Sequence, residues 1–232
     1  MGDMVREGIV APTGLIAHGR GEAFDYLIGE RTTTEAQGAE RAAVALLMGA
    51  KRPVITVNGN AAALAAKGLT DLARLTSSKL EVNLFHRSEE RVQRVCDYLE
   101  EQGGLRVLGR VPDAMLPHIA SDRAKCTLEG IYSSDVVLIP LEDGDRAMAL
   151  KKMGKKVIAI DLNPLSRTSL SADIAIVDEL TRAVSVMLAT AKEMILDPKE
   201  RDRALTSFNN HENLAITLEG ICQNLRRQAR SV

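Results

Sequence analysis

The sequence predicts an α/β fold built on a mostly parallel sheet with helices on both faces. Short apolar runs rich in β-branched residues alternate with helical segments along the chain, which is the pattern of repeated strand–helix units. Several runs are apolar at nearly every position, as in Val136-Val-Leu-Ile139, and such runs are typical of strands covered on both faces. The length of 232 residues, without a shift in composition, favours one Rossmann-like domain over residues 1–232.

Seven strands are expected from these runs. The first is short and ends in a glycine-rich turn, and the third alternates between apolar and polar residues, which places it nearer a sheet edge or along a site. The others are bounded by Pro, Gly, Asn or Asp, as strands usually are. The predicted strands are Gly14–His18, Pro53–Asn58, Lys79–Phe85, Arg106–Gly109, Asp135–Pro140, Lys156–Leu162 and Ala172–Val177.

Helices are expected between the strands and after the last one. Thr32 and Glu35 form a capping box before the first helix, and Asn60 is the expected N-cap of the second. Residues 103–130, with two adjacent glycines and two prolines, form the least regular region. The predicted helices are Thr33–Ala50, Ala61–Leu75, Ser88–Gln102, Asp145–Met153 and Glu179–Met194, with two C-terminal helices at about 198–208 and 211–228 that pack on the domain or extend from it.

Composition excludes several classes of protein. A net charge of −1 and only three Phe, three Tyr and no Trp argue against nucleic-acid binding. Three widely spaced cysteines and scattered histidines suggest neither a disulfide framework nor a zinc site. The sequence shows no apolar leader and no run of membrane-spanning length. We therefore expect a cytoplasmic protein without membrane contact.

The segment Gly14–Glu30 contains the first motif, His18-Gly-Arg20-Gly. We interpret it as a strand end at which two glycines allow a tight turn and Arg20 fixes a positive charge. Such a turn would hold an anion at the edge of a parallel sheet. His18 is either a general base or a hydrogen-bonding scaffold, and the residues leave both roles open.

A second motif follows the strand at 156–162. Pro164 forces the chain out of the strand, so the neighbouring polar residues fall where ligands of open α/β sheets collect. They suit the ribose, the adenine edge and the phosphates of a nucleotide. The alternative is a turn in which Asx side chains cap their own backbone and Arg167 is solvated. The residues assigned to the nucleotide are Asp161, Leu162, Asn163, Ser166, Arg167 and Thr168.

Two further loops follow predicted strands. Asn58-Gly59-Asn60 opens a helix whose free amides would attract a phosphate or carboxylate, unless it is a plain strand–helix turn. Pro140-Leu-Glu-Asp143-Gly-Asp145-Arg gathers three carboxylates that would place Mg²⁺ or a cationic amine. The alternative makes Asp143 a turn residue and Asp145 a helix N-cap. No Walker loop and no glycine fingerprint for dinucleotides is present.

In this order and spacing, the four motifs resemble those of the archaeal 4-phosphopantoate–β-alanine ligases, also called phosphopantothenate synthetases. The matching stretches run from His18-Gly-Arg20 through Val57-Asn-Gly-Asn60 and Pro140–Arg146 to Asp161-Leu-Asn-Pro-Leu-Ser-Arg167. The resemblance extends from about residue 5 to about residue 220.

The resemblance implies an ATP-dependent ligase of coenzyme A biosynthesis. It would condense 4-phosphopantoate with β-alanine through an acyl-adenylate, release AMP and diphosphate, use Mg²⁺, and work as a homodimer. It also implies that Arg20 holds ATP and that Asp178, Glu179 and Leu180 form a second part of the ATP site. The substrate loop is then Asn58, Gly59 and Asn60, and the catalytic residues are Arg20, His18, Asp143 and Asp145.

Two other functions remain open. One is a nucleotide-binding protein without ligase activity, and the other is a nicotinamide-dependent reductase on the same fold, against which the missing glycine fingerprint counts. Relatives in the resembling family carry a further helical segment before the position of Arg6, and that segment supplies an arginine to the ATP site. We therefore expect the present chain to bind ATP weakly and an N-terminally extended one to bind it better.

Overall fold

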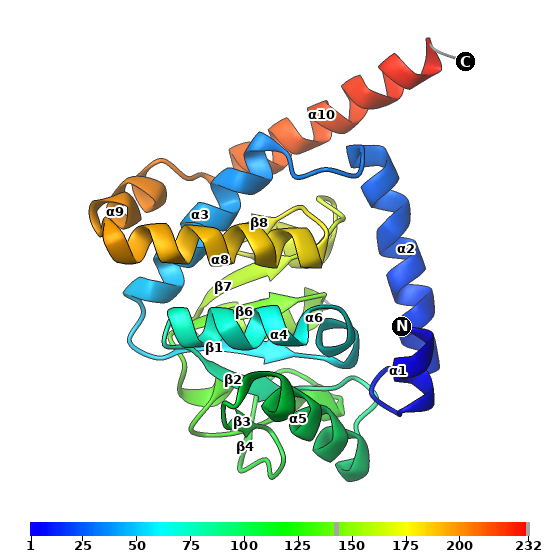
Figure 1. Ribbon diagram of the computed structural model, residues 1–232, viewed down its shortest axis with the longest axis vertical. Helices are drawn as coiled ribbons and strands as arrows, with labels where there is room; N and C mark the ends of the chain where they lie inside the picture. Colours follow the sequence, from blue (N-terminus) through cyan, green and yellow to red (C-terminus); the bar gives the residue numbers. More distant parts are fainter. Residues whose placement is uncertain (142–143, 231–232) are drawn as a thin grey trace.

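The computed structural model describes residues 1–141 and 144–230 and confirms the predicted α/β class (Figure 1). Six strands form a parallel sheet in the order β3-β2-β1-β6-β7-β8, and β4 pairs with β5 in a separate antiparallel ribbon. The strands of the main sheet are β1 (Pro53–Val57), β2 (Lys79–Val82), β3 (Val107–Leu108), β6 (Val136–Pro140), β7 (Lys156–Ile160) and β8 (Ile174–Ile176); the ribbon is β4 (Ala114–Met115) and β5 (Lys125–Cys126).

The strand order reverses between β1 and β6, because the chain first moves outward to β3 and then returns to the other side of β1. Val54 of β1 lies beside Val137 of β6 and, on its other side, beside Lys79 of β2. All five pairings in the main sheet are parallel. In open α/β sheets the crevice at such a reversal, outside the carboxyl ends of the strands, is the usual ligand site.

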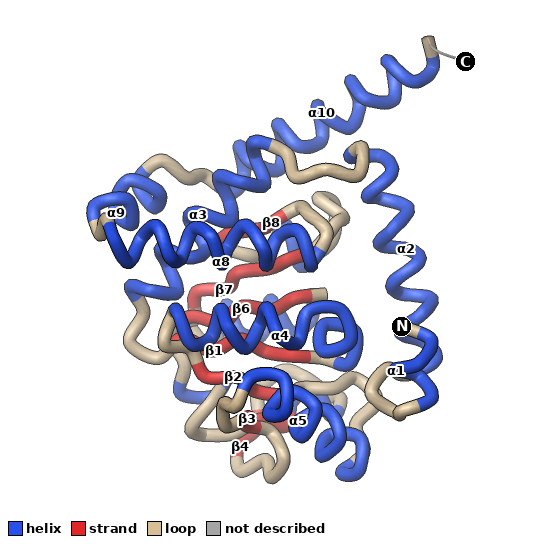
Figure 2. Tube along the Cα trace, viewed as in Figure 1, coloured by secondary structure: helices blue, strands red, loops and turns tan. Residues whose placement is uncertain are grey.

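Helices surround this sheet (Figure 2). Side chains of α3, α4, α5 and α8 form one core with one face of the strands, and α6 and α10 contribute to a second core on the other face. The helices of the described chain are α1 (Gly2–Arg6), α2 (Pro12–Ile28), α3 (Thr34–Gly49), α4 (Gly59–Leu75), α5 (Glu89–Gly103), α6 (Gly144–Lys152), α7 (Arg167–Ser171), α8 (Leu180–Leu196), α9 (Lys199–Thr206) and α10 (Asn210–Ala229).

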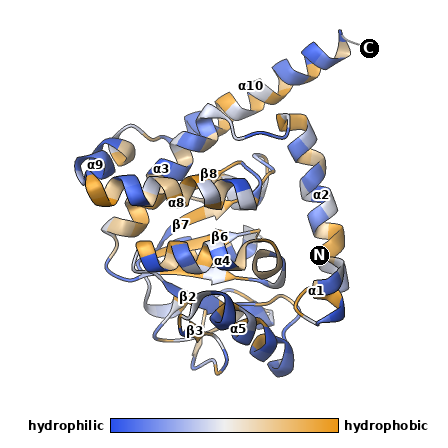
Figure 3. Ribbon diagram, viewed as in Figure 1, coloured by the Kyte–Doolittle hydropathy of each residue, from blue (hydrophilic) through white to orange (hydrophobic). Residues whose placement is uncertain are grey.

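The apolar run of β6 shows why the sheet is covered on both sides. Val136 and Leu138 belong to the core under α4 and α8, whereas Val137 and Ile139 belong to the opposite core. Successive side chains of a strand point to opposite faces, so a run without polar positions requires a helix layer on each. Figure 3 shows β7 coloured as hydrophobic between helices of mixed character.

Two predicted helix caps are shifted. Thr33, rather than Thr32, caps α3, and its hydroxyl accepts from the Ala36 amide at 3.1 Å. Asn58, rather than Asn60, caps α4 by accepting from the Ala61 amide at 3.0 Å. Both displaced residues are engaged elsewhere, because Thr32 and Asn60 hydrogen-bond to other elements.

The predicted strand Gly14–His18 is wrong. This segment belongs to α2, which stands across the carboxyl edge of the sheet, away from the strands (Figure 1). Pro12 at the start presets the helical φ angle, and Gly29 ends the helix with φ +99°. Its apolar residues do not gather on one side, and for that reason the helical period of the segment is hard to recognise.

The irregular region between β3 and β6 lies beside the β2–β3 edge of the sheet (Figure 1) and is held in place by a buried carboxylate. Glu81 of β2 accepts from the amides of Thr127 and Ile131, each at 2.7 Å, and from the Thr127 hydroxyl at 2.9 Å. Burial raises the pKa of Glu81, and these three hydrogen bonds oppose that shift. One strand side chain therefore orders a loop about fifty residues later in the chain.

The C-terminal helices α9 and α10 begin on the body of the protein. α9 packs against α3 and α8, whereas α10 contacts α2, α3 and β8 and then projects outward (Figure 1). Asn213 of α10 donates to the Ala175 carbonyl at 2.9 Å, and Asn224 donates to the Leu27 carbonyl at 2.9 Å. Within residues 1–141 and 144–230, no helix is long and apolar enough to cross a membrane.

Candidate functional site

A pocket of about 770 Å³ lies at the carboxyl edge of the main sheet, with α2 as its outer wall. Residues that follow β1, β2, β6, β7 and β8 all contribute to it. The pocket therefore spans the reversal of strand order between β1 and β6, where the fold leaves space between diverging loops. The predicted site residues that line it are His18, Arg20, Asn58, Gly59, Asn60, Asp161, Leu162, Asn163, Ser166, Arg167, Thr168, Glu179 and Leu180.

The loop after β7 forms the turn with Asx side chains capping its backbone that the sequence allowed, and it also lines the pocket. Asp161 accepts from the Asn163 amide at 3.0 Å and from the Ser166 hydroxyl at 2.5 Å, so its carboxylate shapes the turn. Asn163 in turn accepts from the Leu165 amide at 2.9 Å. These side chains nevertheless line the pocket. Burial raises the pKa of Asp161, while the hydrogen bond from Ser166 and the charge of Arg20 act in the opposite direction.

Arg167 lies at the mouth of the pocket and pairs with Asp145 of α6 at 2.7 Å. Both side chains are about two-thirds exposed, at 64% and 63%, so this pair contributes little to stability and can rearrange around an anion. Gly144 lies against the backbone and Cβ of Arg167, where a larger residue would clash. Asp143, the third predicted residue of this loop, lies outside the described residues.

The segment Asp178–Leu180 is divided between the pocket and the interior. The Glu179 carboxylate lines the pocket and caps α8, where it accepts from the amides of Thr181 and Arg182. Asp178 is completely buried and faces away, toward Thr32 and Arg182. Asp178 therefore supports the Glu179–Leu180 segment from behind rather than lining the pocket.

The loop after β1 joins three elements at the strand reversal. Asn58 donates to the carbonyls of Pro140 and Leu141 at 3.1 and 3.0 Å, which ties the end of β1 to the end of β6. Asn60 donates to the Gly14 carbonyl at 2.8 Å and so holds α2 against the start of α4. All three residues of Asn58–Asn60 line the pocket. The Asn58–Asn60 loop therefore lines the pocket and also holds α2, the helix that forms the outer wall of the pocket.

His18 and Arg20 reach the pocket from α2 rather than from a strand end. The His18 Nε2 atom lies 3.9 Å from a carboxylate oxygen of Glu22, one helical turn later. Arg20 is exposed on its own helix, and its charge acts on Asp161 across the pocket. His18 and Arg20 thus line the same pocket as the Asp161–Thr168 loop, although they lie on a helix and not at the predicted strand end.

Sequence reasoning missed one side of the pocket. Arg91 is half-buried and donates to the Ile9 carbonyl at 3.0 and 3.2 Å and to the His86 carbonyl at 2.7 Å. Arg123 lies over the ring of Phe85, 5.5 Å from its centroid, in a cation–π contact. Arg91, Arg123, Phe85 and His86 all line the pocket.

The pocket is not a preformed metal cage. Among residues 1–141 and 144–230, no three His, Cys, Asp or Glu side chains are arranged to hold a metal ion. Glu22, Asp161 and Glu179 are carboxylates that line the pocket separately. Because Mg²⁺ keeps several waters and binds through one or two carboxylates and substrate phosphates, such isolated oxygen donors fit an ion that arrives with a nucleotide.

Comparison with known proteins identifies the family of this chain. Residues 35–224 match the family described as "Phosphopantothenate/pantothenate synthetase". A Methanosarcina mazei protein named 4-phosphopantoate–β-alanine ligase is 51% identical over 226 residues, which cover 97% of this chain and 89% of the relative. Proteins of the same name from Methanospirillum hungatei and Thermococcus kodakarensis are 54% and 47% identical; the matches cover 83% and 97% of this chain and 78% and 87% of those relatives. The chain belongs to the phosphopantothenate/pantothenate synthetase family.

Proposed function

We propose that this protein is an ATP-dependent ligase that joins 4-phosphopantoate to β-alanine to give 4′-phosphopantothenate, AMP and diphosphate. The family and the names of its relatives support the ligase activity. The observation that carries the proposal is the pocket itself, in which the Asp161–Thr168 loop, the Asn58–Asn60 loop and Arg20 of α2 meet. Three motifs far apart in the sequence thereby form one site of a size suited to a nucleotide and a small acid.

The nucleotide is assigned to the side of the pocket formed after β7 and β8. Asp161 and Asn163 suit the nucleoside, and the apolar side chains of Leu162 and Leu180 give its base a surface to pack on. Arg167 and Arg20 would bind the phosphates, because a guanidinium donates two parallel hydrogen bonds to an oxyanion. Mg²⁺ supplies further neutralisation of phosphate charge when bound, with Asp161 or Glu179 as its protein oxygen donor.

The second substrate is assigned to the side of the pocket formed after β1 and β2. Amides at the start of α4, beside Gly59 and Asn60, attract an anion through the helix dipole. Arg91 and Arg123 add positive charge to the same side. A phosphorylated acid placed there would have its carboxylate directed toward the nucleotide on the other side of the strand reversal.

The proposed reaction has two steps. An oxygen of the pantoate carboxylate attacks the α-phosphorus of ATP, and the bond to the diphosphate oxygen breaks. The β-alanine nitrogen then attacks the acyl carbon, the bond to AMP breaks, and the nitrogen loses its proton as the amide forms. His18 is the pocket residue that we assign to that proton, with Glu22 beside it.

In this reaction, most of the rate acceleration comes from aligning the substrates and neutralising the phosphate charge. The cysteines do not support a covalent thioester route. Cys96 and Cys126 are buried, and burial raises the pKa of each thiol to about 12; Cys222 is exposed but does not line the pocket. A thiol that stays protonated is a poor nucleophile.

Isotope exchange tests the proposal directly. With ATP, Mg²⁺ and 4-phosphopantoate but no β-alanine, labelled diphosphate should enter ATP, since the adenylate forms reversibly. Adding β-alanine should yield AMP and diphosphate in equal amounts with the product. Formation of ADP and orthophosphate would contradict the adenylate route. Unphosphorylated pantoate should react poorly, because an empty phosphate subsite leaves its donors unpaired.

We also propose that residues 1–232 form one cytoplasmic domain that pairs into a homodimer. Large apolar side chains remain exposed on one helix, α2, where Leu15, Ile16 and Tyr26 are 40%, 75% and 64% exposed. Exposed apolar surface of this kind is typical of interaction sites. Analytical ultracentrifugation at micromolar concentration would test the pairing, and a monomer over the whole range would contradict it.

A further inference from the structure

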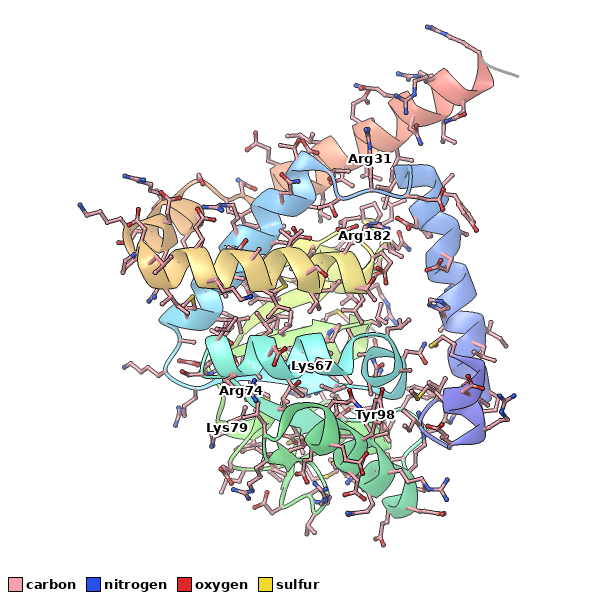
Figure 4. All side chains as sticks on the ribbon, in the orientation of Figure 1. Arg31, Lys67, Arg74, Lys79, Tyr98 and Arg182 are labelled. Carbon is pink, nitrogen blue, oxygen red and sulfur yellow. The ribbon has the colours of Figure 1, made fainter. Side chains whose placement is uncertain are left out.

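A buried cluster of charged groups lies directly behind the pocket, where α2, α3, β8 and α8 meet. It contains three carboxyl groups, those of Asp25, Glu40 and Asp178, which are 5%, 0% and 0% exposed. One guanidinium, that of Arg182, lies among them, and Figure 4 shows Arg182 at the end of α8 that faces α2. If all three acids were ionised, the cluster would carry two uncompensated negative charges away from water, which is strongly unfavourable.

Two of the three acids, Asp25 and Asp178, receive the hydrogen bonds that an ionised carboxylate requires. Arg182 donates to both oxygens of Asp25 at 2.6 and 3.0 Å. It also donates to one oxygen of Asp178 at 2.7 and 3.0 Å, and the Thr32 hydroxyl donates to the other at 2.6 Å. The Glu179 amide adds a bond of 2.8 Å to Asp178. Asp25 and Asp178 are thus provided with donors as ions require.

Glu40 differs from both. Neither of its oxygens receives a hydrogen bond from a donor in the described part of the chain. Its polar neighbour is the carboxyl group of Asp178, within hydrogen-bonding reach. Two carboxyl groups in contact are stable only when they share a proton, and the group without donors is the one that must supply it.

We propose that Glu40 is held as a neutral carboxylic acid that donates a hydrogen bond to Asp178, and that it acts as a positioning residue for the nucleotide side of the pocket. Burial and the adjacent Asp178 raise the pKa of Glu40 to about 9, with Arg182 opposing the shift. The proton removes one of the two excess negative charges and leaves Arg182 shared between two elements.

The charged and polar groups on the elements packed around Glu40 agree with a neutral Glu40. Asp178 and Arg182 face it from the end of β8 and from α8, and Asp25 joins from α2 through Arg182. On α9, Glu200 pairs with Arg41 on the outer side of α3. The buried polar residues of α10 are neutral: Asn213, Thr217 and Asn224.

Through Asp178 the proton of Glu40 affects the pocket in two ways. Asp178 directly precedes Glu179, which lines the pocket and caps α8. Asp178 also orients Arg182, which holds Asp25 of α2 and with it the wall that carries Arg20. Without the proton, the negative charge of Glu40 would repel Asp178. The Glu179 segment and the contact between Arg182 and Asp25 would then both be weakened. The effect on ATP rests on the proposed function, whereas the protonation of Glu40 does not.

Infrared difference spectroscopy tests the protonation without any ligand. At pH 7 the wild-type protein should show the carbonyl band of a buried carboxylic acid that is absent from Glu40→Gln and retained in Glu35→Gln, a matched change on the same helix. Raising the pH through about 9 should remove the band from the wild type. A wild-type spectrum at pH 7 without a band assignable to Glu40 would overturn the proposal.

ATP titration from pH 7 to 10 tests the positioning role. Glu40→Gln keeps a neutral donor toward Asp178, so it should bind ATP as the wild type does at pH 7 and lose the weakening above pH 9 that the wild type and Glu35→Gln show. Glu40→Leu has no donor and should bind ATP about fivefold more weakly at pH 7. Identical pH profiles for the wild type and Glu40→Gln would overturn the positioning role. A wild type that binds no ATP would instead contradict the proposed function, and the infrared result would still decide the protonation.

Discussion

Gly59 is the glycine whose replacement should disturb the site most directly. It is the first residue of α4 and lies against the Ile9 carbonyl and the Arg91 guanidinium. A Cβ atom at this position would stand 2.5 Å from Arg91 Nη2 and closer still to the Ile9 oxygen. Because real Cβ atoms keep at least 3.0 Å from such neighbours, the contact must open by 0.5 Å or more. The two hydrogen bonds from Arg91 to Ile9, at 3.0 and 3.2 Å, would then be broken or bent.

The expected net effect follows from two opposing contributions. Loss of a hydrogen bond to a charged group costs about 1.5–3 kcal/mol, whereas Ala in place of Gly in a helix stabilises by about 0.5–1 kcal/mol. Gly59→Ala should therefore lower the free energy of unfolding by ~1–2 kcal/mol and Tm by ~2–8 °C. The KM for the acid substrate should rise, since the segment before α2 loses its attachment beside the pocket.

Gly38→Ala is the matched control for this experiment. Gly38 lies in α3 with no atom within 4 Å of the position of an added Cβ, so the same substitution should raise the free energy of unfolding by about 0.5–1 kcal/mol. Urea unfolding gives both values and steady-state kinetics gives the KM. If Gly59→Ala were as stable as Gly38→Ala with unchanged KM, the contact between α4 and the Ile9 segment would not matter to the site.

Three further predictions concern charged residues. The folded-state pKa of Glu40, about 9, exceeds its ordinary value of 4.5, so the stability it confers is full below pH 4.5 and is lost as the pH rises through 9. Urea unfolding should show the wild type losing stability relative to Glu40→Gln as the pH rises between these limits, and a constant difference would refute this. Arg167→Lys should raise the KM for ATP tenfold to a hundredfold, because an ammonium cannot form two parallel bonds; wild-type kinetics would place Arg167 outside the site. Glu81→Gln turns an amide toward backbone donors and should destabilise the fold by about 2–4 kcal/mol in the same unfolding assay, whereas a loss below about 0.5 kcal/mol would show that Glu81 does not fix the loop.

The sheet was predictable because its signal is local. Each buried parallel strand must be apolar on both faces, and Val136–Ile139 satisfies that requirement without reference to any other part of the chain. The helix caps are less certain from sequence, because Thr32 and Thr33, or Asn58 and Asn60, have the same chemistry. Tertiary partners decide between them: Asp178 engages Thr32 and the Gly14 carbonyl engages Asn60.

The site was predictable where residues follow strands and not where they reach the pocket from elsewhere. Asp161, Asn163 and Glu179 come directly after strands, and parallel topology brings such positions to one edge. Arg91 and Arg123 come from α5 and from a short helical turn after it. Their directions depend on how α5 and the loop after β3 pack, which a charged run in the sequence does not reveal.

The misassigned helix α2 shows why polar contacts matter at this site. A strand or an amphipathic helix is placed by burying one apolar face, but α2 has no such face, and Asp25 and Ile28 are its two buried residues. Its position is set instead by Asn60 at one end and by Arg182 and Asn224 at the other. A pocket wall held in this way depends on hydrogen bonds and charges from three other helices. The proposed proton of Glu40 and the packing at Gly59 should therefore act on the pocket from the two ends of the same helix.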